Sequence, residues 1–360
     1  MKRDPVKRGP ADLVREEILA LKAYHVAPAG GMVKLDAMEN PYRLPEPLRG
    51  ELGRHAATLP INRYPDPTAP ELARRLRDTF GIPPEAGLLI GNGSDEIIQI
   101  VAHALARPGA ALLAPEPSFA MYKLNSVVAR LRYVGVPLNR DFTLDAARFL
   151  DAIQEHQPAV IFLAYPNNPT GNLFPEDEVA RIIAAAPGLV VVDEAYHVFA
   201  GKTFLGQLAE FENLMVMRTV SKLGLAGVRL GYAVARPEWI RELDKIRPPY
   251  NVSVLAQAIA ERVLAHIDVL HGQAERIKAE RAALLERLRE LDGVVVFPSD
   301  ANFILVRVPD ADAVDARLRE RRILVRNFHG SHPLLANCLR LTVGTPGENE
   351  LLAAALAESL

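Results

Sequence analysis

Residues 159–196 read AVIFLAYPNNPTGNLFPEDEVARIIAAAPGLVVVDEAY, and this stretch decides the fold. Two short apolar runs, AVIFLAYP (159–166) and GLVVVDEAY (188–196), each have the length and composition of a buried strand that ends in a loop. Between them, PEDEVARIIAAA (175–186) has the pattern of a helix. A strand, a helix and a second strand in this order predict two parallel strands of one sheet.

The same alternation extends along the chain on both sides of this stretch. Further buried strands are predicted at ALLAPEP (111–117), NLMVMRTVS (213–221) and RLGYAVA (229–235). Helices are predicted at ELARRLRDTF (71–80) and SDEIIQIVAHALA (94–106). Strands separated by helices indicate the α/β class, with a mainly parallel, doubly wound sheet.

The pattern changes after about Pro248. A long charged amphipathic stretch (274–291) is followed by the predicted strand ANFILVRV (301–308), a helix (310–322) and the strands ILVRNF (323–328) and CLRLTV (338–343). This order is typical of a smaller α+β domain. We therefore predict an N-terminal arm that belongs to the small domain, a large domain and a small C-terminal domain, over residues 1–46, 47–247 and 248–360.

Composition excludes several classes of protein. The 360 residues carry a net charge of −2, which gives no electrostatic footprint for nucleic acid or for an acidic membrane. Cys338 is the only cysteine, so the chain cannot form an internal disulfide and suits a reducing compartment. The basic start lacks the apolar core of a signal peptide, and no apolar run is long enough to span a membrane. We expect a cytoplasmic protein.

Polar residues follow the predicted strands at the edge where open α/β sheets bind ligands. Asn168 follows the strand that starts at 159, and Asp193 and Tyr196 follow the next one. Lys222 comes after the strand 213–221, and it is the only charged residue between Arg218 and Arg229. Burial disfavours an ammonium, so this lysine either lies on a surface turn or provides a neutral, reactive amine.

Together these side chains are the groups that pyridoxal 5′-phosphate requires. A lysine amine holds its aldehyde as a Schiff base, and an aspartate keeps its ring nitrogen protonated. Asn168 and Tyr196 could donate hydrogen bonds to the 3-oxygen of the ring, and Phe119 could cover the ring face. A Schiff base would also remove the cost of burying the charged form of Lys222.

The phosphate group needs a different set of donors. GNGSDE (91–96) places Ser94 and Asp95 at the start of a predicted helix, where free backbone N–H groups bind anions. Ser221 and Arg229 add a hydroxyl and a guanidinium. Each of these residues alone has an ordinary explanation, such as a turn, a helix cap or a surface acid. Their occurrence together at strand ends favours the cofactor site.

These motifs make the sequence resemble the fold-type I, pyridoxal-phosphate-dependent aminotransferases over nearly its whole length. NNPTG (167–171), DEAY (193–196) and the SK…R block (221–229) carry that resemblance. The ENP segment (39–41), DFTLD (141–145) and LRLTVGTPGEN (339–349) are similar to the histidinol-phosphate group of this family. The resemblance implies transamination between glutamate or 2-oxoglutarate and histidinol phosphate or imidazole-acetol phosphate, a step of histidine biosynthesis.

The resemblance also implies roles for single residues. Lys222, Asp193 and Tyr196 match catalytic positions of the family. The cofactor-binding positions of the family are matched by Ser94, Asp95, Phe119, Asn168, Ser221 and Arg229, together with those three. Tyr64 resembles a tyrosine that reaches the cofactor phosphate of a neighbouring subunit, which implies a homodimer with shared sites. The substrate-binding positions are matched by Tyr24, Asn168, Arg326 and Arg340. The resemblance implies that Arg340 binds the glutamate carboxylate and that Arg326 binds the substrate phosphate.

Three departures from the family pattern stand out. The segment between Lys222 and Arg229 is one residue shorter than usual, which affects how far Arg229 reaches. Phe119 stands where many relatives have tyrosine, so ring stacking is kept but a hydroxyl is lost. Tyr24 follows alanine where proline is common, which makes its alignment the weakest.

Other functions remain open at this stage. A broad aromatic aminotransferase and a phosphothreonine-type decarboxylase would share almost every motif. A non-catalytic regulator would need a DNA-binding module ahead of the aminotransferase body, and we do not expect one because the N-terminal arm is short and the net charge gives no support. His329 and His332 with Cys338 lack a fourth metal ligand, so we expect a polar loop and no metal. Arg326 could also be a plain surface residue of a strand.

Overall fold

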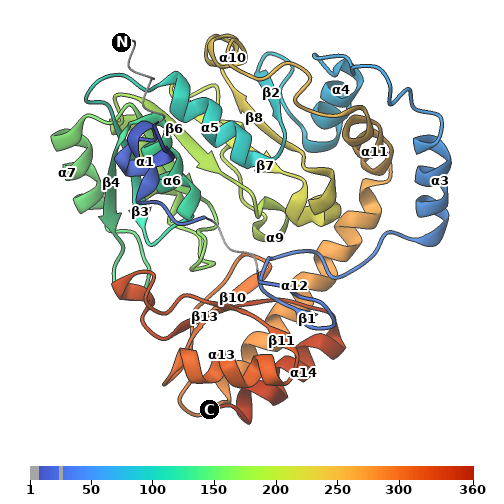
Figure 1. The fold of residues 1–360 in the computed structure, drawn as a ribbon, viewed down its shortest axis with the longest axis vertical. Coiled ribbons are helices and arrows are strands. Elements are labelled where there is room, and N and C mark those ends of the chain that lie inside the picture. The colour runs from blue at the N-terminus through green and yellow to red at the C-terminus, as the bar shows by residue number, and fades with distance from the viewer. Residues whose placement is uncertain (1–7, 24–26) are drawn as a thin grey trace, which may run out of the picture.

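The computed structural model describes residues 8–23 and 27–360, and it contains a large and a small β-sheet with helices packed around both (Figure 1). The helices are α1 (Pro10–Leu13), α2 (Glu16–Leu19), α3 (Glu46–Ala56), α4 (Pro70–Phe80), α5 (Ser94–Ala104), α6 (Ala120–Ala129), α7 (Ala146–His156), α8 (Glu176–Ala185), α9 (His197–Ala200), α10 (Pro237–Asp244), α11 (Val254–Leu264), α12 (Ile267–Arg289), α13 (Ala311–Glu320) and α14 (Pro346–Ala357). Four short helical turns are η1 (Leu205–Gln207), η2 (Ser221–Leu225), η3 (Ala226–Val228) and η4 (Pro333–Leu335).

The large sheet has seven strands in the order β2-β8-β7-β6-β5-β3-β4. They are β2 (Gly87–Gly91), β3 (Ala111–Glu116), β4 (Arg132–Pro137), β5 (Val160–Ala164), β6 (Leu189–Asp193), β7 (Leu214–Thr219) and β8 (Gly231–Ala235). Strands β4, β3, β5, β6 and β7 are parallel to one another, while β8 is antiparallel to both β7 and β2. The predicted mainly parallel sheet is therefore confirmed.

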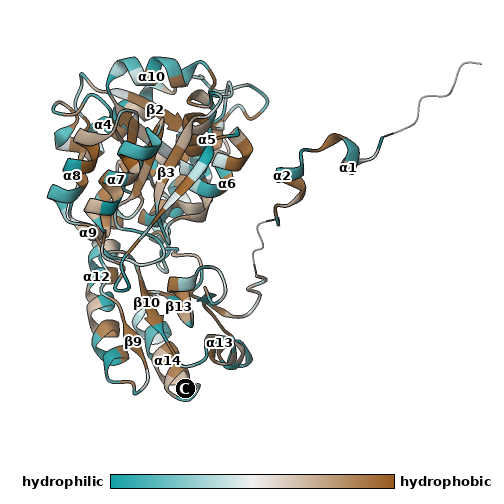
Figure 2. Ribbon diagram, turned by 90° about the vertical axis from the view of Figure 1, so that its left-hand side faces the viewer, coloured by the Kyte–Doolittle hydropathy of each residue, from teal (hydrophilic) through white to brown (hydrophobic). Residues whose placement is uncertain are grey.

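Helices cover both faces of this sheet, which explains why its central strands are mostly apolar, with polar residues at their carboxyl ends. Side chains of α5, α6 and α10 form one core with one face. Side chains of α4, α7, α8 and α11 form a second core with the other face. Every residue of β5, β6, β7 and β8 is buried. Figure 2 shows this distribution as hydrophobic strands inside and polar residues on the outer sides of the helices.

The small sheet has the order β12-β13-β10-β9, and its pairings are antiparallel. Its strands are β9 (Val295–Val296), β10 (Phe303–Arg307), β12 (Arg326–Asn327) and β13 (Cys338–Thr342). The segment predicted as one strand over 323–328 is split, because β11 (Ile323–Leu324) leaves this sheet to pair with β1 (Val33–Lys34). This pairing joins the N-terminal segment to the C-terminal part of the chain. The division into three segments, with its two boundaries, stays a prediction.

The first helices lie at the outside of the molecule (Figure 2). The Arg15 Nη2 atom donates a hydrogen bond to the Val128 carbonyl at the end of α6, at 2.9 Å. Within the described residues, no helix combines the length and the apolar character that a bilayer span needs.

Candidate active site

A cavity that opens to solvent lies at the carboxyl ends of the central parallel strands, and its volume is about 560 Å³ when the solvent space at its mouth is included. All of the predicted cofactor-binding residues except Tyr64 line it. The lining residues are Met38, Ser94, Asp95, Phe119, Ala164, Asn168, Asp193, Ala195, Tyr196, Thr219, Ser221, Lys222 and Arg229. Sheet topology thus brings together side chains that lie far apart in the sequence.

One end of the cavity is formed by the start of α5. Gly93 precedes this helix with a φ of 81°, a conformation that favours glycine. The guanidinium of Arg229 packs against it so closely that a Cβ at Gly93 would lie 2.8 Å from Nη2. Gly231 approaches the same turn from β8, because its Cβ would lie 2.6 Å from the Ser94 nitrogen. Free N–H groups and a guanidinium make this end suitable for an anion.

Arg229 also meets a negative charge at this end. Its Nη2 atom lies 3.4 Å from Asp95 Oδ2, and both side chains are about half exposed. The shorter segment after Lys222 therefore still brings the guanidinium to the start of α5. Ser221 reaches the cavity as well, and its hydroxyl accepts a hydrogen bond from Thr219 at 2.9 Å.

The other end of the cavity holds the carboxylate of Asp193. Tyr122 donates its hydroxyl to Oδ2 at 2.7 Å, and the Ala195 N–H donates to Oδ1 at 3.1 Å. Burial raises the pKa of Asp193 to about 6, although these two hydrogen bonds act in the opposite direction. Sequence analysis missed Tyr122, which reaches the site from α6 across the packed face of the sheet.

A chain of polar contacts runs along one side of the cavity. Asn168 Nδ2 donates to the hydroxyl of Tyr196 at 3.3 Å, and that hydroxyl lies 3.3 Å from the sulfur of Met38. Asn168 Oδ1 accepts from Arg340 Nη1 at 2.6 Å, while Arg340 Nη2 donates to the Asp36 carbonyl at 2.8 Å. This chain connects a strand end of the large sheet with β13 and with the N-terminal segment.

Phe119 lies directly before α6 and contributes its ring to the cavity wall. The ring meets that of Tyr122 edge to face, with centroids 5.6 Å apart. The position predicted to cover a bound ring is therefore held by packing against the residue that binds Asp193.

Lys222 points from the turn η2 into the cavity, where its Nζ atom donates to the Ala37 carbonyl at 3.2 Å. Burial, together with the nearby positive charge of Arg340, lowers the pKa of Lys222 to about 8. The alternative of a lysine on a surface turn is therefore wrong. A neutral amine is accessible near physiological pH.

This pKa predicts the pH dependence of chemical labelling in the cofactor-free protein. At pH 7 about a tenth of the Lys222 amines would be neutral, against roughly one in 2,500 for an ordinary lysine. We expect the rate at which a small amine-reactive reagent labels Lys222 to rise through pH 8 and to level off above about pH 9. Peptide mass spectrometry measures this, with exposed Lys202 as the reference in the same digest. A labelling rate that keeps rising above pH 10 would contradict the assignment.

Arg340 and Arg326 lie next to each other in the small sheet, because β12 and β13 pair them directly. The Arg340 guanidinium lies over the rings of Phe303 and Phe328, at 5.3 and 5.2 Å from their centroids. Arg326 lies 5.8 Å from the centroid of Phe328. Arg340 contacts a residue that lines the cavity, Asn168, whereas Arg326 is one strand further away.

The cavity lining does not include three of the described residues that were predicted for the site, Arg326, Arg340 and Tyr64. Tyr64 is 80% exposed and stacks on Tyr250, with ring centroids 4.4 Å apart. Tyr24 lies outside the described residues. Met38, Ala164, Ala195 and Thr219 line the cavity without having been predicted, and they carry no charge that could have marked them in the sequence.

Comparison with known proteins connects this geometry with a family. The family model "Aminotransferase class I and II" matches residues 31–356. The chain is 57% identical to the histidinol-phosphate aminotransferase of Chromobacterium violaceum over 344 residues, which are 96% of this chain and 97% of that protein.

Solved structures agree in fold. The histidinol-phosphate aminotransferase of Sinorhizobium meliloti in complex with pyridoxal-5′-phosphate has a TM-score of 0.85, 27% identity and coverage of 96% of each chain. The L-threonine-O-3-phosphate decarboxylase of Porphyromonas gingivalis, at 24% identity and a TM-score of 0.78, covers 91% of this chain and 98% of its own, and shares the fold alone.

Proposed function

Because the chain belongs to the class I and II aminotransferase family, we propose that it is a pyridoxal-phosphate-dependent histidinol-phosphate aminotransferase. It moves an amino group between glutamate or 2-oxoglutarate and histidinol phosphate or imidazole-acetol phosphate, in histidine biosynthesis. The observation that carries this proposal is the buried Lys222 amine, which opens into a cavity with a buried carboxylate and an anion-binding helix start.

The two ends of the cavity fit the two ends of pyridoxal phosphate. Asp193 is buried, and both of its hydrogen bonds come from neutral donors, so a protonated ring nitrogen would complete its environment. The start of α5 and Arg229 would hold the phosphate. When bound, the cofactor supplies an aldehyde carbon that carries the amino group and a ring that accepts electrons.

The remaining side chains would orient the cofactor and transfer a proton at the substrate. Asn168 and Tyr196 lie side by side and would face the ring oxygen, while Phe119 would cover the ring. Lys222 would hold the cofactor through its amine, and in its neutral form it would take the proton from the substrate Cα. Its lowered pKa keeps the free amine available for this transfer.

Substrate anions would bind at the arginine pair of the small sheet. Arg340 already makes two hydrogen bonds through its two terminal nitrogens, and it presents a planar fork to a carboxylate. Arg326, on the neighbouring strand, adds a second positive charge. Two adjacent guanidinium groups can serve a dicarboxylate in one half-reaction and a phosphate ester in the other.

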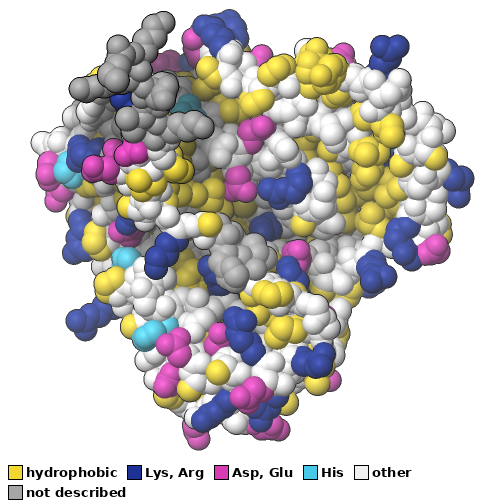
Figure 3. Space-filling view, in the orientation of Figure 1, with side chains coloured by type: hydrophobic (Ala, Val, Ile, Leu, Met, Phe, Trp, Pro, Cys, Tyr) yellow, Lys and Arg dark blue, Asp and Glu magenta, His cyan; other side chains and the backbone are white. Residues whose placement is uncertain are grey.

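A second copy of this chain is the protein partner of the proposed enzyme. Exposed apolar side chains gather around α11 and the segment before α4 (Figure 3), and they include Ile61, Tyr64, Tyr250 and Leu255. A patch of this kind is typical of a subunit interface. Burial there would give the exposed Tyr64 a partner surface, which supports the predicted homodimer with shared sites. A cytoplasmic location also stays a prediction.

A single-turnover titration tests the proposed reaction. The purified protein is loaded with pyridoxal phosphate and titrated separately with histidinol phosphate, phenylalanine and phosphothreonine, while absorbance follows the cofactor. Histidinol phosphate is expected to convert the cofactor to its stable amine form at the lowest concentration, because the arginine pair binds its phosphate.

The other two compounds separate the alternatives. An equal response to phenylalanine would favour a broad aromatic aminotransferase, and release of carbon dioxide from phosphothreonine would favour a decarboxylase. A folded protein that does not bind the cofactor would disprove the proposal as a whole.

A further inference from the structure

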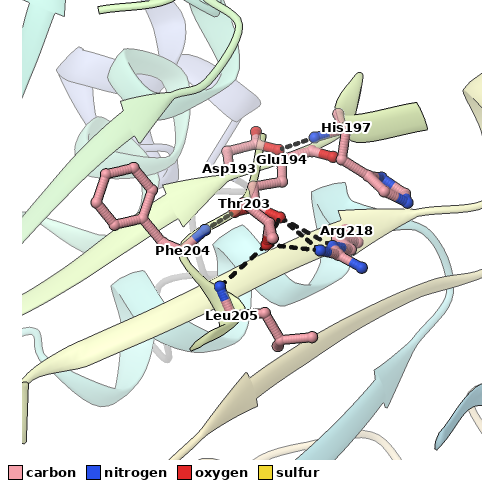
Figure 4. Close-up of polar contacts among 8 residues, drawn as sticks. Asp193, Glu194, His197, Thr203, Phe204, Leu205 and Arg218 are labelled. Carbon is pink, nitrogen blue, oxygen red and sulfur yellow. Dashed lines mark hydrogen bonds and ion pairs between the residues drawn. The ribbon is translucent and has the colours of Figure 1, made fainter. Parts of the chain in front are cut away.

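A buried ion pair lies behind the candidate active site, on the opposite face of the large sheet (Figure 4). Arg218 of β7 donates to the Glu194 Oε2 atom from Nε at 2.9 Å, and its Nη2 atom lies 2.8 Å from the same oxygen. The side chains of Glu194 and Arg218 are 0% and 5% exposed. A pair buried this deeply persists only when its remaining polar atoms are also bonded.

The segment after α9 supplies those further bonds. Thr203 donates its hydroxyl to Glu194 Oε2 and accepts from Arg218 Nη2, both at 2.8 Å. The Phe204 N–H donates to Glu194 Oε1 at 2.6 Å, and the Leu205 N–H donates to the Thr203 hydroxyl at 3.0 Å. Figure 4 shows Phe204 and Arg218 on opposite sides of Glu194, with Thr203 between them. None of the five lines the cavity.

The position of the pair in the sheet gives it a second property. Side chains alternate between the two faces of a strand, so Glu194 and its neighbour Asp193 point to opposite faces. Asp193 faces the cavity, whereas Glu194 points to the other face of the sheet and pairs there with Arg218. Arg218 stands directly before Thr219, which lines the cavity, and four positions before Lys222.

The next strand completes the arrangement. Tyr232 of β8 is the pairing partner of Arg218, and it follows Gly231, whose backbone packs against the start of α5. Three neighbouring strands thus carry site residues on one face and this cluster on the other. Burial lowers the pKa of His197 to about 3, so this adjacent ring stays neutral and adds no charge to the pair.

We infer that Glu194 and Arg218 are positioning residues that fix Asp193 and the Lys222 turn relative to each other from behind the cavity. The inference rests on the proposed cofactor chemistry. The ion pair spans the β6–β7 junction, and the Thr203 segment locks the turn that leads from Asp193 through Tyr196. When one partner loses its charge, the strand ends shift and the partner that remains is buried without compensation.

The test replaces Glu194 with its isosteric amide. Glu194→Gln is expected to raise the dissociation constant for pyridoxal phosphate, measured by equilibrium dialysis of the cofactor-free protein, by about 10-fold to 100-fold, as residues that orient ligating groups do. The kcat is expected to fall about 10²-fold, as for a small misplacement of reacting groups. The KM for glutamate should change little, because Arg340 is untouched. Circular dichroism of the bound cofactor should change, because it reports ring orientation.

Three further variants separate positioning from stability. Leu72→Ala removes a buried side chain of α4 in the same core and is expected to lower the melting temperature without changing cofactor affinity. Arg218→Lys keeps the charge and should restore part of the affinity lost in Arg218→Gln. Thr203→Val removes three hydrogen bonds but no charge, and it decides the question if Glu194→Gln does not fold. It should weaken cofactor binding in the same direction.

Two results would overturn the inference. One is a folded Glu194→Gln variant that keeps the cofactor affinity and kcat of the wild type. The other is a Leu72→Ala variant that loses affinity to the same extent at equal loss of melting temperature. Failure of the wild type to bind the cofactor would instead remove the proposed function, which distinguishes the two failures.

Discussion

Lys222→Ala is expected to abolish transamination, with kcat reduced by at least about 10⁴-fold. The variant loses both the amine that would hold the cofactor and the base that would move the proton at the substrate Cα. Its cavity neighbours should stay in place, because the hydrogen bond that the Nζ atom makes goes to a backbone carbonyl, that of Ala37. Steady-state and single-turnover assays measure the loss.

A covalent readout accompanies the kinetics. Borohydride treatment followed by peptide mass spectrometry should fix the mass of the cofactor on the peptide that contains Lys222 in the wild type and on no peptide of the variant. Lys202→Ala, which removes an exposed lysine outside the cavity, should behave like the wild type. Attachment of the cofactor to a different lysine in the wild type would refute the assignment.

Asp193→Asn is expected to be the second most damaging substitution, with kcat reduced about 10²-fold to 10³-fold. The amide keeps the shape of the side chain and its contact with Tyr122, but it removes the charge that would keep the ring nitrogen protonated. The cofactor should still bind through the phosphate end and Lys222. The kcat should therefore fall while the cofactor remains bound. A variant with the full kcat would exclude the proposed role of Asp193 at the ring nitrogen.

Asp193→Asn should lower activity but should not lower the thermal stability of the cofactor-free protein. The pKa of Asp193 is about 6 in the folded cofactor-free protein and about 4 in the unfolded chain, so the folded state binds more protons between these values. Its contribution to stability is therefore present below pH 4 and is lost as the pH rises through 6. At pH 7.5 the cofactor-free Asp193→Asn variant should melt no lower than the wild type. Asp145→Ala, which removes the side-chain cap of α7, is the control that loses stability but not activity.

Much of the fold was predictable because its central strands are apolar and bounded by turns. The predicted strands at 111–117, 159–166, 188–196, 213–221 and 229–235 correspond to β3, β5, β6, β7 and β8. The edge strands β2 and β4 were missed, since edge positions need less apolar sequence and β4 is only partly buried. Local patterns identify strands that are covered on both faces better than those that are not.

The cavity residues were predictable where a motif marks the end of a strand. Tyr122 was missed, because its contact with Asp193 depends on how α6 packs across the sheet, 71 positions away in the chain. Met38 was missed for a similar reason, since the N-terminal segment reaches the cavity through contacts with Asn302 and Thr342. Tyr64 needs a second chain, so its predicted role stays a prediction.

The cavity also has a mechanical consequence, because its surroundings belong to two separate hydrophobic cores. Strand ends of the large sheet form most of the wall, while Met38 and Tyr196 belong to the core of the small sheet. A ligand that touches both cores binds only while they are packed against each other. Its binding therefore stabilises the packed arrangement of the two cores. Loss of the ligand would therefore destabilise the contact between the two cores before it destabilises either core.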